Sequence, residues 1–407
     1  MALIADLENI LKTFYLPPIR SQLNTSTVLL DRIRAGSEQV SGQDVVTPLM
    51  VGYSQGVGAR SEDGTLPTAR KSLYDTSTTQ LKANYGRIQL SGHLMRATRD
   101  DRGSFVRAVG SEIQNMVDGL KQDYNRQCCG DGTGALATVN DSTGLGTPTD
   151  IVVSNTQYFK YDMPIVHYNG ASAIGTARVT DINDDTNTLT FASAATGTWV
   201  NGQPIYRGNA TTEAGGTNNK DAEIMGLTGI CDTGTLQGID PTAAIGRSGV
   251  TGSVDSKASY WKTAKKDSST TTLTLSAMQD CFTAVEKKAG SVNLLVTSYE
   301  LRDIYATLLE SQRRYVNVME LESGFKGLEY NGQPLIPDKD CPEKHMFFLD
   351  TGALSFQKKG DWDWMDMDGA IWSRVADKEA YEATIVLESQ LVTTARNRSA
   401  VMTALTG

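Results

Sequence analysis

The chain has 407 residues, a formal net charge of −9 and a sequence pI near 5.0. Its length predicts two or three compact units with a sizeable core. The net negative charge argues against a protein whose main function is to bind phosphate groups, because such proteins carry a basic face. No run of about 18 apolar residues occurs, so the sequence predicts no membrane-spanning helix.

The cysteine content indicates a reducing environment. The five cysteines form neither an even framework nor a Cys-x-x-Cys motif, which favours synthesis in a reducing cytosol. The adjacent pair Cys128–Cys129 is therefore interpreted as structural rather than redox active. The 38 glycines, with many Thr, Ser and Asn residues, favour β structure with frequent turns.

The first 50 residues predict a helix followed by an irregular segment. Apolar residues recur at helical spacing in residues 3–14, and Pro17–Pro18 ends the pattern. A short apolar segment then covers Thr27–Ile33. A polar loop at Gly36–Gln43 precedes the next part of the chain.

A long polar arm with several glycine turns follows residue 50. Residues Thr79–Met95 alternate in polarity, and the phase changes after Gly86, which predicts a bent hairpin strand with a glycine bulge. Its mate is expected in Leu66–Tyr74 or in part of Thr47–Tyr53, with turn chemistry at Ser61–Gly64. A hairpin with so little apolar area is marginal in water, so we expect another surface to cover it.

One unusually long amphipathic helix comes next. It is expected to start near Asp100–Asp101, where carboxylates suit a helix N-terminus, and to end at Gly130. About 28 residues would form a rod of about 40 Å. Its apolar stripe covers one side only, which predicts one helix against one sheet. The stripe consists of Phe105, Val109, Ile113, Met116, Val117, Leu120 and Tyr124.

Residues 150–209 predict a small all-β module. Short apolar runs are separated by turn residues, and the clearest hairpin turn is Asn183–Asn187. The residues from Glu223 to Val254 are expected to be mostly loop with short strands. The expected strands of the module are Ile151–Val153, Pro164–His167, Ala177–Ile182, Thr188–Phe191 and Pro204–Arg207.

Regular α/β patterning returns at Thr272. Ser276–Gln279 predicts a capping box for a helix that continues to Ala289 and is ended by Gly290. Val292–Thr297 predicts a buried strand, and Thr297–Glu300 a second capping box before a helix to about Arg314.

The chain is expected to end in sheet. Apolar and polar residues alternate in Met346–Phe356 and again in Tyr381–Thr394, which predicts two long strands. Trp362, Trp364 and Trp372 lie between them. A core or subunit contact is the favoured interpretation of this aromatic group, and a stacking site is the alternative.

The sharpest catalytic pattern is Gly52–Gly56, which matches the Gly-x-Ser-x-Gly elbow around the serine nucleophile of α/β hydrolases. The elbow needs a helix immediately afterwards, but Val57–Gly64 is typical of a loop. A strand-end turn at Ser54 is therefore favoured over catalysis. A hydrolase would also need an acid and a histidine, for which the candidates are Asp338, Asp340 and His345.

Other site-like patterns also favour structural roles. Asp181-x-Asn183-x-Asp185 begins like a calcium loop, but Thr186 replaces the required glycine and Ala192 the bidentate glutamate, so a hairpin turn is favoured. Gly130–Gly134 resembles a phosphate loop but follows a helix, which indicates a helix stop. The scattered His93, His167 and His345 argue against a metal site. Solvated surface is favoured for the basic clusters Lys262, Lys265, Lys266 and Gln312, Arg313, Arg314.

Taken in order, the parts resemble a tailed-bacteriophage major capsid protein with the Hong Kong 97-type coat fold. The resemblance covers essentially the whole chain. Three local strings support it: Ser111–Ile113 with the exit Gly130–Gly134, then Gly332–Asp338, then Ser389–Val392 with Arg396–Asn397. It implies an α+β fold with residues 1–50 as N-terminal arm, 51–95 as extended β E-loop, 96–149 as spine helix and start of the peripheral domain, 150–225 as inserted β domain, 226–340 as axial domain and 341–407 as the C-terminal sheet of the peripheral domain.

The resemblance also implies a function. A major capsid protein self-assembles through hexamers and pentamers into an icosahedral shell. The shell encloses double-stranded phage DNA without tight sequence-specific binding. The expected location is the virion capsid after assembly in the host bacterial cytoplasm. Expected partners are further copies of the chain and scaffolding, portal and decoration proteins, with no membrane. Because β signals begin within about 50 residues, scaffolding is expected from a separate protein or from a removed segment.

The sequence thus predicts a structural protein with no catalytic, cofactor-binding or metal-binding residues. The alternatives are a serine esterase that uses Ser54 and another phage component such as a decoration or tail protein. Family relatives sometimes join an E-loop lysine to an asparagine of a neighbouring subunit, and Lys71 and Asn397 are the conceivable partners here. Deleting Arg60–Leu73 is expected to leave a folded monomer that forms no stable shells.

Overall fold

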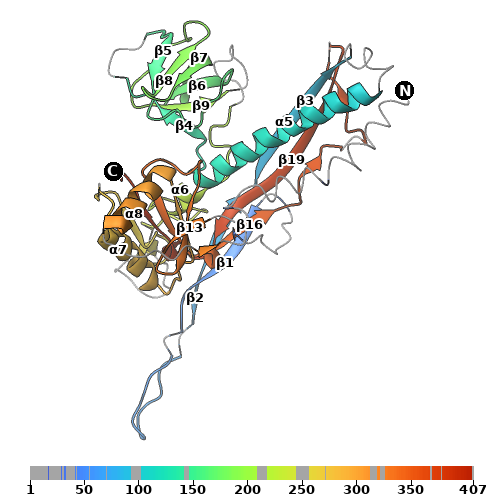
Figure 1. Cartoon of the computed structure of the whole chain (residues 1–407). Coiled ribbons are helices and arrows are strands. Elements are labelled where there is room, and N and C mark those ends of the chain that lie inside the picture. Colours follow the sequence, from blue (N-terminus) through green and yellow to red (C-terminus); the bar gives the residue numbers. More distant parts are fainter. Residues whose placement is uncertain are drawn as a thin grey trace. The chain divides into compact units, whose positions relative to one another are not determined.

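The computed structural model describes residues 17, 29, 32–33, 42, 44–54, 56–69, 71–92, 102–141, 146–208, 218–243, 256–270, 272–311, 319–320, 326–366, 369–376 and 378–405. The helix expected at residues 3–14, most of the segments expected between residues 27 and 43, His93 and the cluster at residues 312–314 lie outside them. The chain divides into two compact units, one of residues Met1–Lys121 with Leu227–Gly407, the other of Gln122–Gly226 (Figure 1). Within the described ranges no helix has the length and apolar character needed to cross a membrane.

In the first unit a long helix lies against a five-stranded antiparallel sheet (Figure 1). The helix predicted from residue 100 to 130 is confirmed as α5 (Arg102–Cys129), and its stripe residues Ile113 and Val117 are buried. β19 (Ala380–Thr393) is the central strand of the sheet. Along one edge it pairs with β3 (Lys82–Ser91), and along the other with β16 (Leu354–Lys358), β17 (Asp363–Trp364) and β18 (Ser373–Arg374).

The close approach of helix and sheet explains Gly86. A Cβ atom at this position would lie 2.5 Å from Leu120 Cδ1, so a side chain there would force the packed side chains of the helix and the sheet to shift. The predicted bulge is wrong, because β3 pairs with β19 along its whole length without a register shift. The phase change in the sequence arises because Gly86, Ile88 and Leu90 share the buried face, whereas Tyr85 lies on the opposite, exposed face.

The mates predicted for the strand Thr79–Met95 are wrong, because its described residues pair with Asp44–Val45 and with β19, and not with Leu66–Tyr74 or Thr47–Tyr53. The chain changes partner at Leu81: β2 (Leu73–Gln80) pairs with β1 (Asp44–Gly52), while β3 pairs with β19 near the C-terminus. Such long-range pairing leaves no local sequence signal. The predicted turn at Ser61–Gly64 is confirmed by a hydrogen bond from Gly64 N to Ser61 O of 2.9 Å.

A seven-stranded mixed sheet with two helices forms the other part of the first unit. Its core contains Leu295 and Phe348 from the sheet and Val285 and Leu301 from the helices α7 (Leu275–Glu286) and α8 (Tyr299–Ser311). The buried strand expected at residues 292–297 is confirmed. In spatial order the strands are β10 (Lys265–Asp267), β20 (Ala400–Met402), β15 (Met346–Leu349), β11 (Leu294–Thr297), β14 (Gln333–Pro337), β13 (Lys326–Tyr330) and β12 (Met319–Glu320).

Both predicted capping boxes are displaced. α7 is capped by Thr274, whose Oγ1 accepts from Ala277 N at 3.2 Å, so the helix begins before Ser276. At the start of α8, Leu301 N donates to Ser298 Oγ at 3.5 Å. Thr297 is instead the fully buried last residue of β11. Strand burial takes precedence over a local capping pattern here.

The first of the two strands expected near the C-terminus is interrupted. Asp350 Oδ1 accepts from Gly352 N at 3.0 Å and starts the short 3₁₀ helix η3 (Thr351–Ala353), which separates β15 in one sheet from β16 in the other. The second expected strand is confirmed as β19. Trp362, Trp364 and Trp372 are buried, which confirms the core interpretation. The remaining short elements are α6 (Leu227–Ile230), η2 (Lys257–Ser259) and η4 (Arg396–Arg398).

The second unit contains a six-stranded antiparallel sheet that closes on itself. All five strands predicted after residue 150 are present, and the sequence missed β4. An antiparallel bridge between Val139 and Val153 joins the two end strands, and the interior includes Ile165, Leu189 and Ile205. In spatial order the strands are β4 (Ala135–Thr138), β9 (Pro204–Arg207), β6 (Pro164–Asn169), β7 (Ser172–Asn183), β8 (Thr188–Phe191) and β5 (Asp150–Val152).

Candidate functional site

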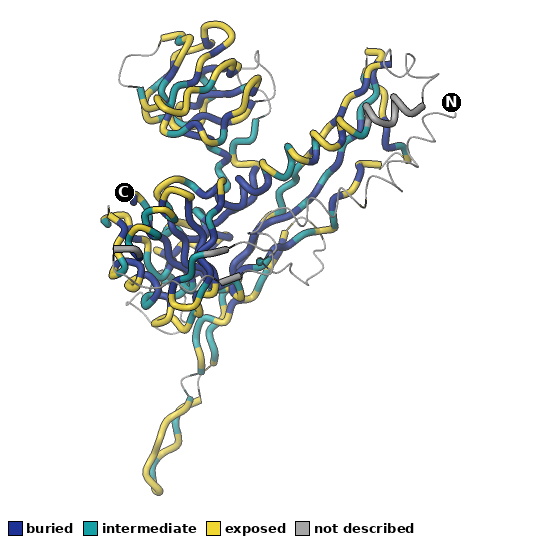
Figure 2. The backbone as a smooth tube through the Cα atoms, viewed as in Figure 1, coloured by how far each residue is buried: buried dark blue, intermediate teal, exposed yellow. Residues whose placement is uncertain are grey.

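Residues 53–72, here called the arm, extend from the hairpin of β1 and β2, here called the root (Figure 1). The tip is closed by the turn at residues 61–64 and by a hydrogen bond from Arg60 Nε to Thr65 O of 3.0 Å. Figure 2 shows the described part of the arm exposed along most of its length. The described part of the arm thus has local turn structure but no core of its own.

Large apolar side chains gather on the arm, on its root and on the adjoining strand β3. Ten are strongly exposed among the described residues, and seven of these belong to residues 44–85. Covering such surface stabilises by about 25 cal/mol per Å², so contiguous exposed apolar area marks a contact surface. The seven, with exposed fractions, are Val46 (57%), Met50 (54%), Tyr53 (77%), Val57 (81%), Leu66 (81%), Tyr74 (70%) and Tyr85 (61%).

The root has two different faces. Its inner face is buried, and Leu49 there packs with Ile239 and Trp261 of the same subunit. Strand alternation places Val46, Pro48 and Met50 on the opposite face, directly across from β2 residues of the same face. The root therefore belongs to its own subunit through one face and offers the other, which is lined by Val46, Pro48, Met50, Tyr74, Thr76 and Thr78.

An ion pair fixes the inner face of the root. Asp75 accepts hydrogen bonds from Lys257 Nζ at 2.6 Å and from Tyr260 Oη at 2.7 Å. Burial alone would raise the pKa of the Asp75 carboxyl, but these two donors outweigh it and hold the pKa below its ordinary value. Asp75 is thus charged at neutral pH and anchors β2 to the body of the subunit.

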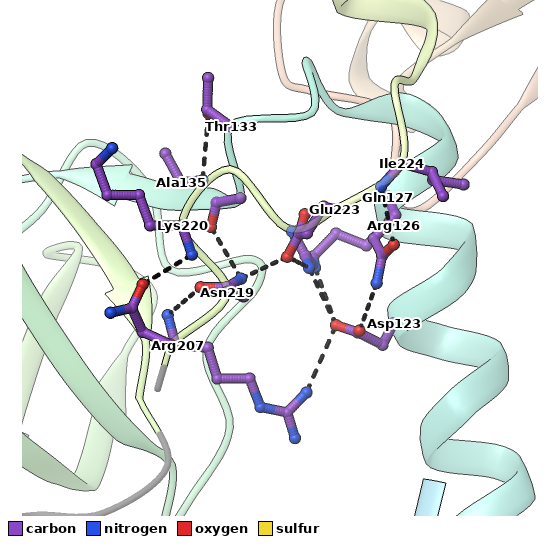
Figure 3. Close-up of polar contacts among 12 residues, drawn as sticks. Asp123, Arg126, Gln127, Thr133, Ala135, Arg207, Asn219, Lys220, Glu223 and Ile224 are labelled. Atoms are coloured by element: carbon purple, nitrogen blue, oxygen red, sulfur yellow. Dashed lines mark hydrogen bonds and ion pairs between the residues drawn. The ribbon is translucent and has the colours of Figure 1, made fainter. Parts of the chain in front are cut away.

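A buried polar network lies where the end of α5 leads into the closed sheet of the second unit (Figure 3). Arg126 is shared by two carboxylates: its Nη2 contacts Asp123 Oδ1 at 3.1 Å and also pairs with Glu223. Asp123 further contacts Arg207 Nη1 at 3.5 Å. Asn219 joins Glu223 to the backbone, because its Nδ2 also donates to Gly134 O at 3.0 Å.

The two carboxylates of this network differ in electrostatics. Burial raises the pKa of Glu223, and its single arginine partner does not fully offset this. Burial acts on Asp123 in the same direction, but Arg126 and Arg207 together outweigh it and lower the pKa. The spacing of Asp123 and Arg126 by three residues on one helix face is typical of an ion pair and could be recognised in the sequence. Nothing in the sequence connects them to Asn219 or Glu223, roughly a hundred residues away.

No family model matches the sequence, and no curated protein matches it. The structure is similar to the capsid asymmetric unit of cyanophage A-1(L), with a TM-score of 0.53 and 14% identity over 96% of this chain and 93% of that chain. The chain has the Hong Kong 97-type coat fold. Similarity also extends to the capsid of a native GTA particle (TM-score 0.49, 9% identity, 93% and 90% coverage) and to the SrpI encapsulin complex of Synechococcus elongatus (0.47, 8%, 93% and 86%). The similarity to the cyanophage capsid confirms the expected α+β coat fold.

Within this coat fold, Ser54 occupies a turn. Its Oγ accepts from Gly56 N at 3.3 Å, and the described residues between 56 and 69 contain no helix, so the elbow context is missing. His345 Nδ1 lies 2.7 Å from Glu343 O, and burial lowers the pKa of its ring. Asp338 Oδ1 accepts from Asp340 N at 2.8 Å. The carboxylate of Asp340 pairs with Lys339 Nζ at 3.0 Å. Each candidate of the esterase alternative thus makes a contact with a residue close to it in the sequence.

The other patterns also occupy structural positions in the coat fold. Asn183 Oδ1 accepts from the backbone N of Asp185 and Thr186 at 3.1 and 3.2 Å, which confirms the hairpin turn. Gly130–Gly134 follows the end of α5 as expected. His167 Nε2 accepts from Val200 N at 3.0 Å, and burial lowers the pKa of its ring to about 4. Across the described part of the chain, no three His, Cys, Asp or Glu residues cluster in a way that could hold a metal ion.

Two predictions concern exposed lysines. Lys266 pairs with Asp232 at 2.5 Å and Lys265 with Asp267 at 3.3 Å, so two of the three lysines of this basic cluster are paired with carboxylates, and Lys262 is exposed. Lys71 is exposed at the end of the arm that adjoins β2, and Asn397 is partly buried in η4. A bond between them would join two copies of the chain, and it stays a prediction.

Proposed function

We propose that this chain is a major capsid protein whose copies assemble through hexamers and pentamers into an icosahedral shell around double-stranded phage DNA. The observation that carries the proposal is the exposed apolar surface of the arm and its root, which together hold six of the ten strongly exposed large apolar side chains among the described residues of a chain with a coat fold. Repeated head-to-tail contacts between copies close into rings, and interfaces of permanent assemblies exceed about 2,000 Å². The net charge of −9 supports enclosure of DNA without tight binding.

The proposal extends to organisation and location. Residues 51–95 would act as the E-loop, 96–149 as the spine, 226–340 as the axial domain and 341–407 as the peripheral sheet. The compact unit Gln122–Gly226 supports a separate inserted β domain, although its sheet begins with β4, before residue 150. The chain would be made in the host bacterial cytoplasm and reside in the virion capsid. Scaffolding, portal and decoration proteins would be its partners, and it would need no catalytic site, cofactor or metal.

The experiment removes the arm without disturbing the root. Gly52 and Leu73 are register partners, so an Asn-Gly turn can replace residues 53–72 between them. This improves on deleting Arg60–Leu73, which would remove the first residue of β2. We expect the unaltered chain to form shells in negative-stain electron microscopy. The shortened chain should give a folded subunit, by circular dichroism and thermal melting, that forms none.

A matched control keeps the arm and changes only its polar tip, Glu62→Gln. Shells should form as they do with the unaltered chain, because the apolar side chains remain. Normal shells from the shortened chain would overturn the role of the arm. An unaltered chain that stays monomeric under assembly conditions would overturn the proposed function itself.

A further inference from the structure

The root and the five-stranded sheet diverge at a fork, and buried polar side chains line this fork. β3 pairs with β19 only as far as Ser389, whereas β19 continues to Thr393. Beyond Ser389 this edge of β19 is completed by side chains in place of a strand. Gln390, which is buried, donates from Nε2 to Gln80 O at the end of β2 at 3.2 Å.

A second buried glutamine, Gln237, stands in a strained backbone conformation at the same fork. It is the first central residue of a two-residue turn, closed by hydrogen bonds from Leu236 N to Ile239 O (3.1 Å) and from Ile239 N to Leu236 O (2.9 Å). Gln237 has φ of 51° and Gly238 has φ of 74°, as in a type I′ turn. Asn or Gly commonly fills the first position, so a glutamine held there points to a role for its side chain.

The Gln237 side chain acts as a peptide group would. With the amide oriented so that its oxygen and its nitrogen both meet complementary partners, Oε1 accepts from Thr393 N at 2.8 Å, and Nε2 donates to Thr393 O at 3.0 Å and to Ser77 Oγ at 2.9 Å. Its own backbone O accepts from Thr78 N at 3.0 Å. Gln237 therefore satisfies both backbone groups of Thr393 on β19 and at the same time binds two consecutive residues of β2.

We propose that Gln237 is the positioning residue that sets the direction in which the root, and with it the arm, leaves the subunit. Hydrogen bonds to both β19 and β2 fix one geometry because they are directional, whereas apolar contacts alone tolerate sliding. Ser77 and Thr393 are also buried, so a displaced root would leave polar groups without partners. Only the assembly consequence of this inference rests on the proposed function.

The test measures hydrogen exchange of the Thr78 and Thr393 amides in the unassembled subunit. Gln237→Glu keeps the size of the side chain but loses the donor to Thr393 O at neutral pH. We expect protection factors for both amides to fall at least tenfold at pH 8. They should recover near pH 5, because burial at this position raises the pKa of a glutamate above its ordinary value of about 4.3 and the protonated side chain again donates. The contacting side chains Ser77 and Thr393 do not titrate in this range.

Two further variants distinguish the effect of side-chain length at Gln237 from the effects of added charge and of turn preference. Gln237→Asn suits the positive φ better but is one methylene shorter, so we expect lost protection without recovery at pH 5. Gln80→Glu adds the same charge to an exposed position on β2 and should leave protection within twofold of the unaltered chain. Protection within twofold in both Gln237 variants would overturn the inference.

Assembly provides the second measurement. Gln237→Asn leaves every arm residue unchanged, yet we expect fewer and less regular shells in electron microscopy because the arms leave the root in varied directions. Regular shells at full yield, despite lost protection, would contradict the positioning role. If the unaltered chain itself formed no shells, the proposed function would fall, and the exchange data would still decide how Gln237 fixes the root.

Discussion

The arm leaves Val57 and Leu66 81% exposed, whereas the closed sheet of the second unit buries Ile165, Val179 and Ile205 completely. The two regions also differ in charge, because residues 122–226 hold eleven acidic and five basic side chains and so most of the net charge. The closed sheet has its own core and a polar surface. The arm has apolar surface and no core. Substitutions in the closed sheet should therefore act on folding, and substitutions in the arm on association.

The largest effect on folding is expected at the buried network of the second unit. Arg126→Met leaves Asp123 and Glu223 without their shared cation in a buried site, and breaking buried pairs in this way costs about 3–5 kcal/mol. We expect hydrogen exchange of strands β6 and β9 to report this loss of unfolding free energy. The arm should exchange as before, which would sharpen the contrast between the two regions.

An exposed ion pair in the same unit provides the control. Arg178 contacts Asp162 at 2.5 Å, but their side chains are 46% and 74% exposed. Surface pairs contribute about 0–1 kcal/mol, so Arg178→Met should change little. Equal effects of the two substitutions would show that burial of Arg126 is unimportant.

A smaller effect is expected at the root of the arm. Asp75→Asn removes the charge that Lys257 binds but keeps an oxygen for Tyr260, so we expect a loss of about 1 kcal/mol in the local opening of β2. Because the folded-state pKa of Asp75 lies below 3.8, its contribution is present above that pH and is lost as the pH falls through the lowered value. Asp118→Asn, at an exposed pair on α5, is the matched control. If the amide hydrogens of β2 exchanged at the same rate in Asp75→Asn as in the unaltered chain, Asp75 would not be an anchor of β2.

The elements with local signals were predictable from the sequence. The 28 residues of α5 have a continuous apolar stripe, and the strands of residues 150–209 are short runs between turn residues. The errors arose from long-range pairing. The partner of β3 is not encoded within a local window, because β19 is distant in the sequence. The junction between β15 and β16 depends on the local cap of Asp350 on Gly352 N, which the alternation of apolar and polar residues obscured. Gly86 appeared to mark a bulge because close packing by Leu120 was invisible.

The candidate site was predictable only in outline. Turn residues and scarce apolar residues identified the arm as an element that needs a partner surface. The anchors that hold its root, Asp75, Gln237 and Gln390, are ordinary polar residues whose partners lie about 150 to 300 residues away. Hydrogen bonds between such distant residues follow from the fold and have no sequence spacing to reveal them.

A still smaller effect, with a defined sign, is expected at Glu223. Its raised pKa means that the folded state binds a proton more readily than the unfolded chain, so stability rises as the pH falls from the folded-state value towards 4.5. Glu223→Gln should abolish this dependence and cost less than 1 kcal/mol at neutral pH, on the order of one weakened hydrogen bond. Thermal melting between pH 5 and 7.5 tests it. A melting temperature that falls on acidification only in the unaltered chain would reverse the assignment.

The smallest effect on folding is expected where the effect on association is largest. Val57→Ser with Leu66→Ser removes apolar side chains that contact little of their own subunit, so the free energy of unfolding should change by no more than about 0.5 kcal/mol. Shell yield in electron microscopy should fall sharply, because those side chains are available only to another copy. Thr68→Val, an apolar substitution at another exposed arm position, should not lower the yield. If the serine variant instead melted earlier and still assembled, the arm would be part of its own subunit's core, and its contrast with the closed sheet would disappear.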